Sequence, residues 1–224
     1  MIIIALDPPV NEDASLWIKH RYEVLRDIVQ GFKIGLPAIV KHGTNGIVSY
    51  FKGYDGLLIA DLKLADIGDI MALVTKWLKK AGFNTVIAHG FVGYKQGLEM
   101  LARTCKEEEI NLVMVVSMSH EGSKEFIDKH VDDFLELAKT IETWGVVAPA
   151  TRPEVIKYIR SKLGTNVKIL SPGVGAQGAS PGDALCAGAD YEIIGRAITH
   201  AVDIRGTALN IISRQRRKVI ECRG

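Results

Sequence analysis

Short runs rich in Ile, Val and Leu alternate along the chain with longer amphipathic stretches. Such runs are typical of buried strands, and the amphipathic stretches are typical of helices. Their alternation predicts βα units around a parallel sheet. We expect eight strands, at residues 2–6, 31–34, 57–62, 84–88, 112–117, 144–148, 167–170 and 191–194.

The even spacing of these units favours a closed (β/α)8 barrel, the TIM barrel, with residues 1–224 forming a single domain. Between successive runs there is room for one helix and two loops, and no insertion is long enough for a second domain. A doubly wound open sheet is the alternative, because a strand count read from one sequence can differ by one or two from the true number.

Glycines and charges indicate where helices end. Gly82, Gly145 and Gly164 stand where a helix would stop and turn into the next strand. The last helix is expected to begin near Ala197 and to end in the basic stretch 214–218. That stretch suits a solvated helix end that complements the helix dipole better than it suits a nucleic-acid surface.

The composition narrows the range of partners and locations. Apolar residues make up 47% and charged residues 24%, and the net charge of +2 is too balanced to imply a nucleic-acid partner. The N-terminal apolar run stops at Asp7, which is too soon for a signal sequence or a membrane span. Cys105, Cys186 and Cys222 are far apart, so we predict neither a disulfide framework nor a zinc site, and expect a reducing cytoplasm.

The third strand carries the most informative polar residues. Side chains two apart on a strand point the same way, which places Asp61 and Lys63 together in the barrel mouth, while Leu62 and Leu64 face the helices. Asp66 lies in the following loop, where it can curl back over the mouth or reach across a subunit interface. The alternative is a salt-bridged pair on an exposed edge strand.

Charges at two other strand ends favour a functional interpretation. Asp7 after the first strand and Lys33 in the second would converge with Asp61 and Lys63 near the barrel axis. Burying four charges is costly unless their signs alternate and they share hydrogen bonds. Adjacent carboxylates would keep Lys63 protonated, ready to neutralise a carbanion and donate a proton. Lys63 is therefore a candidate general acid.

Glycine-rich loops follow the last two strands, where barrels usually bind phosphate. They comprise residues 171–182 and the pair Gly195-Arg196, in which backbone N–H groups and a guanidinium can hold a dianion. The alternative is an ordinary flexible turn. His89 is expected to be a hydrogen-bonded structural residue. No clustered His or Cys pattern predicts a metal, and no nucleotide-cofactor motif is present.

Taken together, these motifs resemble a known family. The segment Asp61-Leu-Lys-Leu-Ala-Asp-Ile67 is similar to the D-x-K-x-x-D-I signature of orotidine 5′-monophosphate decarboxylases. Further segments resemble the family in order and spacing over nearly the whole chain: Ala5–Asp7, Phe32–Gly35, His89-Gly90, Met118–His120, Thr151–Glu154, Pro172–Gly178 and Gly195-Arg196.

The resemblance implies decarboxylation of orotidine 5′-monophosphate to uridine 5′-monophosphate, the last step of de novo pyrimidine nucleotide synthesis, without metal or cofactor. Lys63 would protonate C6 of the ring as CO₂ leaves, Asp61 would lie beside the departing carboxylate, and Lys33 and Asp66 would complete the charge network. The family also implies a homodimer with shared active sites, in which Asp66 comes from the partner subunit.

Further residues are implied to bind the substrate: Asp7 a ribose hydroxyl, Ser119 the pyrimidine, Gln177 the base and the phosphate, Gly195 and Arg196 the phosphate, with Pro172 beside them. Residues 175–182 would close over the ligand. The chain departs from the family after the signature, since Ile70 replaces a hydroxyl residue that would contact the ribose across the dimer.

Two rival functions are distinguished by particular residues. A magnesium-dependent group, the hexulose-phosphate synthases and ketogulonate-phosphate decarboxylases, resembles the chain at Asp61, Lys63 and Asp66 but places a metal-binding glutamate near the position of Lys33. A lysine there would repel Mg²⁺ and favours the metal-free reaction. A barrel that binds a phosphorylated ligand without catalysis is the other rival, and the intact charged set argues against it.

Overall fold

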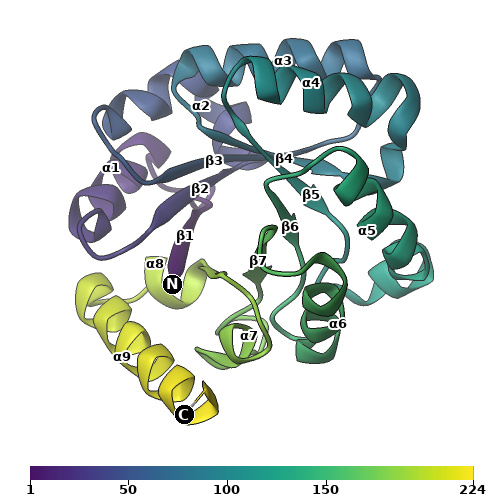
Figure 1. Ribbon diagram of the computed structural model, residues 1–224. Coiled ribbons are helices and arrows are strands. Elements are labelled where there is room, and N and C mark those ends of the chain that lie inside the picture. Colours follow the sequence, from purple (N-terminus) through teal and green to yellow (C-terminus); the bar gives the residue numbers. More distant parts are fainter. Residues whose placement is uncertain (224) are drawn as a thin grey trace.

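The computed structural model describes residues 1–223, and within them eight parallel strands pair in chain order and close on themselves, because β1 pairs with both β2 and β8 (Figure 1). The predicted (β/α)8 barrel is confirmed and the open sheet is wrong. The strands are β1 Ile2–Leu6, β2 Gly31–Gly35, β3 Leu57–Leu64, β4 Thr85–His89, β5 Asn111–Val115, β6 Gly145–Val147, β7 Lys168–Pro172 and β8 Tyr191–Ile194.

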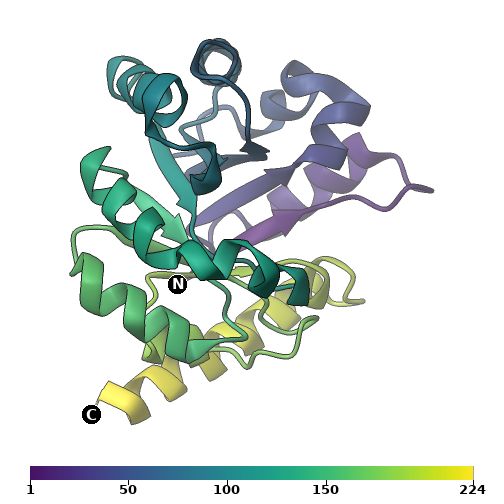
Figure 2. The same ribbon diagram turned by 90° about the vertical axis from the view of Figure 1, so that its right-hand side faces the viewer.

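Helices surround the strands on the outside of the barrel (Figure 2). The longer ones are α1 Ala14–Leu25, α2 Leu36–Val48, α3 Gly68–Ala81, α4 Glu99–Glu107, α5 Val131–Thr140, α6 Pro153–Leu163 and α9 Ile204–Arg223. Shorter helical segments are η1 Ser49–Phe51, η2 Gly90–Val92, η3 Tyr94–Leu98, η4 Glu121–Glu125, η5 Ile127–His130, α7 Asp183–Cys186 and α8 Arg196–Thr199. None of the described helices is both long and apolar enough to cross a membrane.

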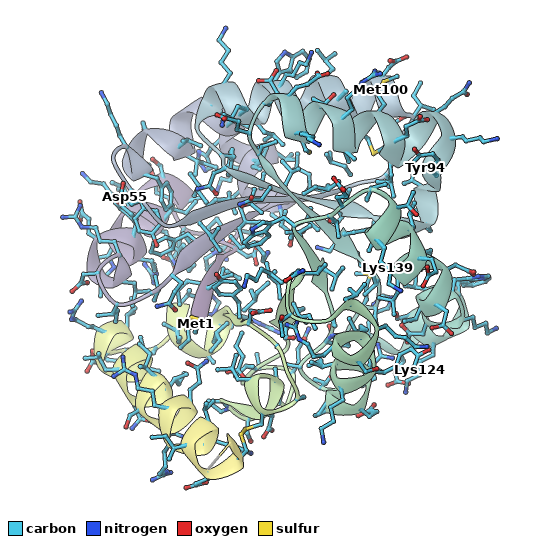
Figure 3. The ribbon with its side chains drawn as sticks, in the orientation of Figure 1. Met1, Asp55, Tyr94, Met100, Lys124 and Lys139 are labelled. Carbon is cyan, nitrogen blue, oxygen red and sulfur yellow. A yellow bond between two sulfur atoms is a disulfide. The ribbon has the colours of Figure 1, made fainter. Side chains whose placement is uncertain are left out.

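Alternation along each strand divides the core into two layers. In β1, Ile3 and Ala5 point into the barrel, whereas Ile2, Ile4 and Leu6 pack against the helices. Side chains fill the space between strands and helices, and polar ones such as Lys124 and Lys139 project from the periphery (Figure 3). Both faces of every strand are therefore covered, as a parallel sheet requires.

Of the three glycines predicted to end helices, two do so and one does not. Gly82 and Gly164 both follow the last residue of a helix with φ of 114° and 65°, which glycine adopts at little cost. The prediction for Gly145 is wrong, because α5 ends at Thr140 and Gly145 begins β6. A side chain there would press on the backbone oxygen of Lys168 in β7, so close packing of strands explains this glycine.

The C-terminal helix is also different from the prediction. The chain forms the short helix α8, breaks, and starts α9 at Ile204. Asp203 provides the start signal, since its carboxylate accepts a hydrogen bond from the backbone N–H of Gly206 at 2.8 Å. The basic stretch 214–218 lies inside α9, which continues to Arg223.

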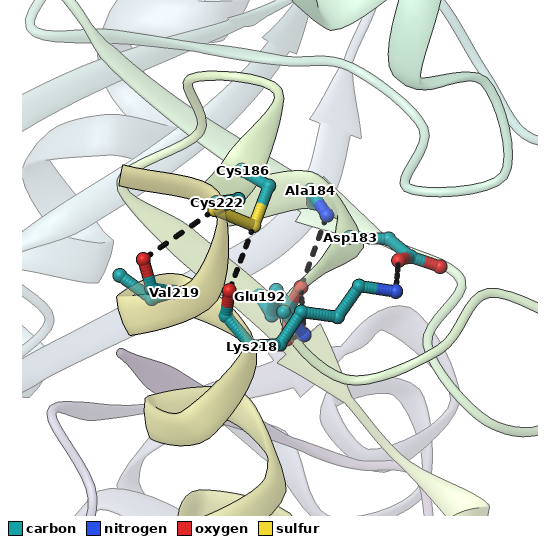
Figure 4. Close-up of a disulfide and its surroundings, with 8 residues drawn as sticks. Asp183, Ala184, Cys186, Glu192, Lys218, Val219 and Cys222 are labelled. Carbon is teal, nitrogen blue, oxygen red and sulfur yellow. Dashed lines mark hydrogen bonds and ion pairs between the residues drawn. A yellow bond between two sulfur atoms is a disulfide. The ribbon is translucent and has the colours of Figure 1, made fainter. Parts of the chain in front are cut away.

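A disulfide joins Cys186 in α7 to Cys222 in α9, so the prediction that these cysteines form no disulfide is wrong (Figure 4). The two residues are 36 positions apart, and only the docking of α9 on α7 brings their Cα atoms to 6.0 Å. Cys105 is a free, buried thiol whose pKa is raised to about 12 by burial. Cys105 is therefore an unreactive core residue.

Removing this disulfide should lower stability measurably. Closing a loop of this length restricts the unfolded chain, and Cys222→Ser is expected to cost about 2–4 kcal/mol. For a chain of this size the thermal midpoint should fall by roughly 5–15 °C, measured by scanning calorimetry. The native protein in a dithiol reductant should show a similar fall, while Cys222→Ser should not respond to the reductant. A native midpoint that is the same with and without reductant would contradict the prediction.

Candidate active site

Three charged side chains meet at the mouth of the barrel and form what we call the charge cluster: Lys33 from β2, with Asp61 and Lys63 from β3. The Lys33 Nζ atom lies 2.7 Å from Asp61 Oδ2, and Lys63 Nζ lies 2.9 Å from Asp61 Oδ1. Lys33 and Asp61 are only 8% and 7% exposed. The carboxylate of Asp61 thus bridges two ammonium groups inside a closed barrel, and the edge-strand alternative is wrong.

The backbone at Lys63 is unusual. Ala60 pairs with Val86 and Leu64 pairs with Ala88. The chain therefore advances four residues along β3 while it advances two along β4, which makes a bulge in β3. Lys63 lies in this bulge with φ of 46°, a left-handed conformation that side-chain-bearing residues rarely adopt. Such a conformation costs about 1–3 kcal/mol and persists only where surrounding contacts hold it. Here the bidentate contact with Asp61, at 2.9 and 3.0 Å, is one of them.

The charge cluster shifts the pKa values of its buried members in opposite directions. Burial alone would lower the pKa of Lys33, but the charges of Asp61 and Asp7 outweigh it and raise that pKa. Burial would raise the pKa of Asp61, but Lys33 and Lys63 outweigh it and lower that pKa. Lys33 and Asp61 therefore both carry their charges at neutral pH, as a buried pair of opposite sign requires.

A cavity of about 370 Å³ opens above the charge cluster. Its floor is the apolar inner face of the barrel, with Ala5, Ile87, Val115, Val147 and Ile193. The wall contains all seven residues predicted to bind substrate: Asp7, Lys33, Ser119, Pro172, Gln177, Gly195 and Arg196. Residues from at least six different strands or their loops therefore converge on one site, as the sequence predicts.

Asp66 is the predicted site residue that this chain does not bring to the cavity. Its side chain is exposed, and its Oδ1 atom accepts a hydrogen bond from the neighbouring backbone N–H of Ile67 at 2.7 Å. Within the described part of the chain, Asp66 forms no ion pair with Lys33 or Lys63 and does not line the cavity. Its assignment to the charge network therefore stays a prediction.

Asp7 is fitted against the backbone of β2. The carboxylate lies so close to Gly35 that any side chain at position 35 would collide with its Oδ1 atom. The absence of a side chain at Gly35 thus gives room for the close approach of a loop carboxylate. The same approach places the negative charge of Asp7 near enough to Lys33 to help raise its pKa.

The loop after β7, residues 173–182, forms one side of the cavity and is called the β7 loop below. It folds as a tight turn in which the N–H of Gly178 donates to the carbonyl of Gly175 at 2.9 Å. Gly173, Gly175 and Gly178 have φ between 79° and 115°, values that glycine adopts freely. Residues 175–178 are exposed, so backbone N–H groups and Gln177 stand at the cavity edge.

Arg196 is the first residue of α8 and faces the cavity beside the β7 loop. It is exposed, and no carboxylate among residues 1–223 forms an ion pair with it. His200, four residues later, lines the same cavity and was missed by the sequence analysis. Its signal was the spacing of i and i+4 from Arg196, which places both on one helix face.

Ser119 is supported by a polar network behind it. Asp128 accepts hydrogen bonds at 2.8 Å from Ser117 and Ser123, and it pairs with Arg152. Arg152 also donates to the Ser117 hydroxyl at 2.9 Å and to the carbonyl of Met118. Arg152 therefore fixes the segment that carries Ser119.

His89 ends β4 beside the charge cluster, with its ring 4.6 Å from that of Phe91. Burial and the positive charge of Lys63 lower its pKa below the usual 6.5. Its buried Nδ1 atom has no hydrogen-bond partner in the described part of the chain, so the expected hydrogen bond is not found at this nitrogen. His89 is therefore a neutral imidazole at physiological pH.

The lowered pKa of His89 predicts a loss of stability in mild acid. Below pH 6.5 the unfolded chain binds a proton at His89 that the folded protein resists, so the free energy of unfolding falls as the pH drops from 7 towards 5. In the His89→Asn variant, the decrease in the free energy of unfolding that is due to His89 should be absent. Urea unfolding at both pH values measures it, with His20→Asn on the exposed surface of α1 as the matched control. Identical pH dependence in native and His89→Asn proteins would refute it.

No cluster of three or more His, Cys, Asp or Glu residues that could hold a metal ion occurs in the described portion of the chain. The side chains that face the cavity offer two ammonium groups, a guanidinium and carboxylates instead. Such a site can hold an anionic group at one end, through Arg196 and the β7 loop, and can supply a proton at the other, through Lys63.

The closed barrel and its site define a class: a (β/α)8-barrel enzyme with its chemistry at the carboxyl ends of the strands. Comparison with known proteins specifies it. Residues 1–211 match the pattern of the orotidine 5′-phosphate decarboxylase / HUMPS family, and the chain belongs to that family.

Its relatives cover nearly the whole chain. Orotidine 5′-phosphate decarboxylase from Aeropyrum pernix is 45% identical over 98% of this chain and 91% of its own, and that from Pyrococcus furiosus is 44% identical over 94% and 95%. Among solved structures, orotidine 5′-monophosphate decarboxylase from Sulfolobus solfataricus has a TM-score of 0.85 at 35% identity. The match covers 97% of this chain and 98% of the other. The orotidine 5′-monophosphate decarboxylase from Methanocaldococcus jannaschii, complexed with inhibitor BMP, has a TM-score of 0.82 at 30% identity. That match covers 97% of this chain and 96% of the other.

Proposed function

We propose that this protein decarboxylates orotidine 5′-monophosphate to uridine 5′-monophosphate without metal or cofactor, in the cytoplasm, as the last step of pyrimidine nucleotide synthesis. The observation that carries the proposal is the buried Asp61 carboxylate held between Lys33 and Lys63 in a cavity that Arg196 also lines. The Cys186–Cys222 disulfide would be exceptional in a reducing cytoplasm, where structural disulfides are rare outside the intracellular proteins of hyperthermophiles.

The reaction breaks the bond between C6 of the ring and the carboxylate, and the electron pair of that bond stays on C6 as CO₂ departs. The ammonium of Lys63 stabilises this charge and then gives one proton to C6, leaving a neutral amine. Asp61 orients Lys63 through two hydrogen bonds and lies beside the departing carboxylate. Lys33 holds Asp61 ionised and in place.

Binding energy from the remote phosphate supports the chemistry at the other end of the cavity. The phosphate would be bound by Arg196, Gly195 and the backbone of the β7 loop. Gln177 would contact both the phosphate and the base, and Ser119 would contact the pyrimidine. Asp7 would bind a ribose hydroxyl, and Pro172 lines the same pocket. Residues 175–182 would close over the bound nucleotide. Closure would exclude water from the charge cluster and strengthen its electrostatic effect.

We also infer a homodimer in which Asp66 reaches the partner's site. Exposed apolar side chains follow Asp66 at helical spacing along one face of α3: Ile67, Ile70, Leu73 and Trp77. An apolar stripe of this kind suits a subunit interface. Ile70 lies within it, so the apolar residue that departs from the family pattern would contribute to packing between subunits.

Purified protein treated with EDTA should convert orotidine 5′-monophosphate to uridine 5′-monophosphate, followed as an ultraviolet absorbance change. The rate should be unaffected by the chelator, because the charge cluster supplies the stabilisation that a metal would otherwise provide. Absence of turnover would refute the proposed function. Turnover restored only by Mg²⁺ would instead assign the protein to the magnesium-dependent group.

A further inference from the structure

The carboxylate of Glu192, buried between the barrel strands and the surrounding helices, is hydrogen-bonded to the end of the β7 loop. Glu192 lies in β8, and its side chain points away from the barrel axis, since Ile193 is the neighbour that faces the cavity. Glu192 is fully buried. A carboxylate in such a place must be satisfied by hydrogen bonds, because an unpaired buried charge is strongly destabilising.

The hydrogen-bond donors to Glu192 come from the last residue of the β7 loop, from α7 and from α9. The backbone N–H of Gly182 donates to both carboxylate oxygens, at 2.9 and 3.0 Å, and that of Ala184 donates to Oε1 at 3.2 Å. Gln215 of α9 donates its Nε2 to Oε2 at 3.0 Å, and its own Oε1 accepts from the amino group of Met1. Glu192 therefore joins the last residue of the β7 loop to the C-terminal helix.

α9 makes further contacts with the end of the β7 loop and with α7. Gly182 has φ of 94°, and a Cβ there would approach the Cβ of Lys218 to 2.9 Å, so loop and helix are in direct contact. The Lys218 ammonium pairs with Asp183, and the Cys186–Cys222 disulfide closes the far side (Figure 4). Residues 175–178 are exposed, whereas Pro181 and Gly182 are buried against this support.

We propose that Glu192 and Gln215 are positioning residues that hold the C-terminal end of the β7 loop for binding the substrate phosphate. This inference rests on the proposed function, because that function assigns the phosphate to this loop. With Gly182 fixed, the exposed residues 175–178 lose less conformational entropy when they close over a phosphate. Neither residue lines the cavity, so their effect is transmitted through the backbone of the loop.

Glu192→Gln and Gln215→Leu test the proposal. Each removes about one buried hydrogen bond from the support, and uridine 5′-monophosphate should bind about tenfold more weakly, as measured by calorimetry. Uridine, which lacks the phosphate, should bind as it does to the native protein. The matched control is Glu221→Gln, the same chemical change at an exposed position of α9. In turnover, KM should rise about tenfold with kcat nearly unchanged.

Two outcomes would overturn the proposal. Either variant binding the nucleotide as tightly as the native protein would show that the support does not act on the loop. A parallel loss of uridine and nucleotide binding would show general damage to the site, and Gln215→Leu, which leaves the charge of Glu192 in place, guards against a simple folding failure of Glu192→Gln. Native protein that binds the nucleotide but does not decarboxylate its precursor would refute the proposed function and leave this inference intact.

Discussion

Lys63→Ala is expected to abolish turnover while leaving nucleotide binding largely intact. The variant loses both the proton donor and the cation that faces the developing carbanion, effects worth about 10²–10⁴ and 10²–10³ respectively, so kcat should fall at least about 10⁴-fold. The fold should survive, because Asp61 keeps its ion pair with Lys33 at 2.7 Å. Phosphate contacts on the opposite side of the cavity remain available for binding.

Single-turnover absorbance measurements and calorimetry with uridine 5′-monophosphate separate the two properties. Lys80→Ala, at an exposed position in α3, is the matched control and should retain full activity. If Lys63→Ala lost affinity for the nucleotide as severely as it lost turnover, Lys63 would be a binding residue and the assignment of the proton donor would be wrong.

The barrel was predictable because its signal is repeated. Each βα unit contributes an apolar strand and an amphipathic helix, so an error of a few residues in one unit leaves the architecture unchanged. β3 illustrates this, since it extends to Leu64 rather than ending at residue 62. The direction of Asp61 and Lys63 followed from strand periodicity, and both side chains indeed enter the mouth of the barrel.

Other features were hidden because they depend on tertiary packing. The left-handed backbone of Lys63 results from a bulge against β4, and no local residue signals it. The disulfide depends on how α9 docks on α7, which the spacing of Cys186 and Cys222 does not reveal. Asp203 did carry a local signal, an N-cap ahead of α9, and attention to it would have divided the last helix correctly.

The candidate site was predictable where single strand ends determine it. Asp7, Lys33, Ser119 and Arg196 converge because the carboxyl ends of all strands meet at one face of a closed barrel. His200 was missed because it lies a helical turn beyond its strand end. Asp66 is different, since its proposed role depends on a partner subunit, and the periodicity of one chain cannot place a residue across an interface.

Arg196→Ala is expected to produce the converse of the Lys63→Ala result. Its guanidinium is unpaired among the described side chains and can give two charge-assisted hydrogen bonds to a phosphate, so uridine 5′-monophosphate should bind about 100- to 1,000-fold more weakly. Uridine, which has no phosphate, should lose nothing. Arg214→Ala, an exposed arginine of α9, is the control in the same calorimetric titration. Because Arg196 and Lys63 are assigned to opposite ends of one ligand, equal loss of binding and turnover in both variants would mean that the two roles are misassigned.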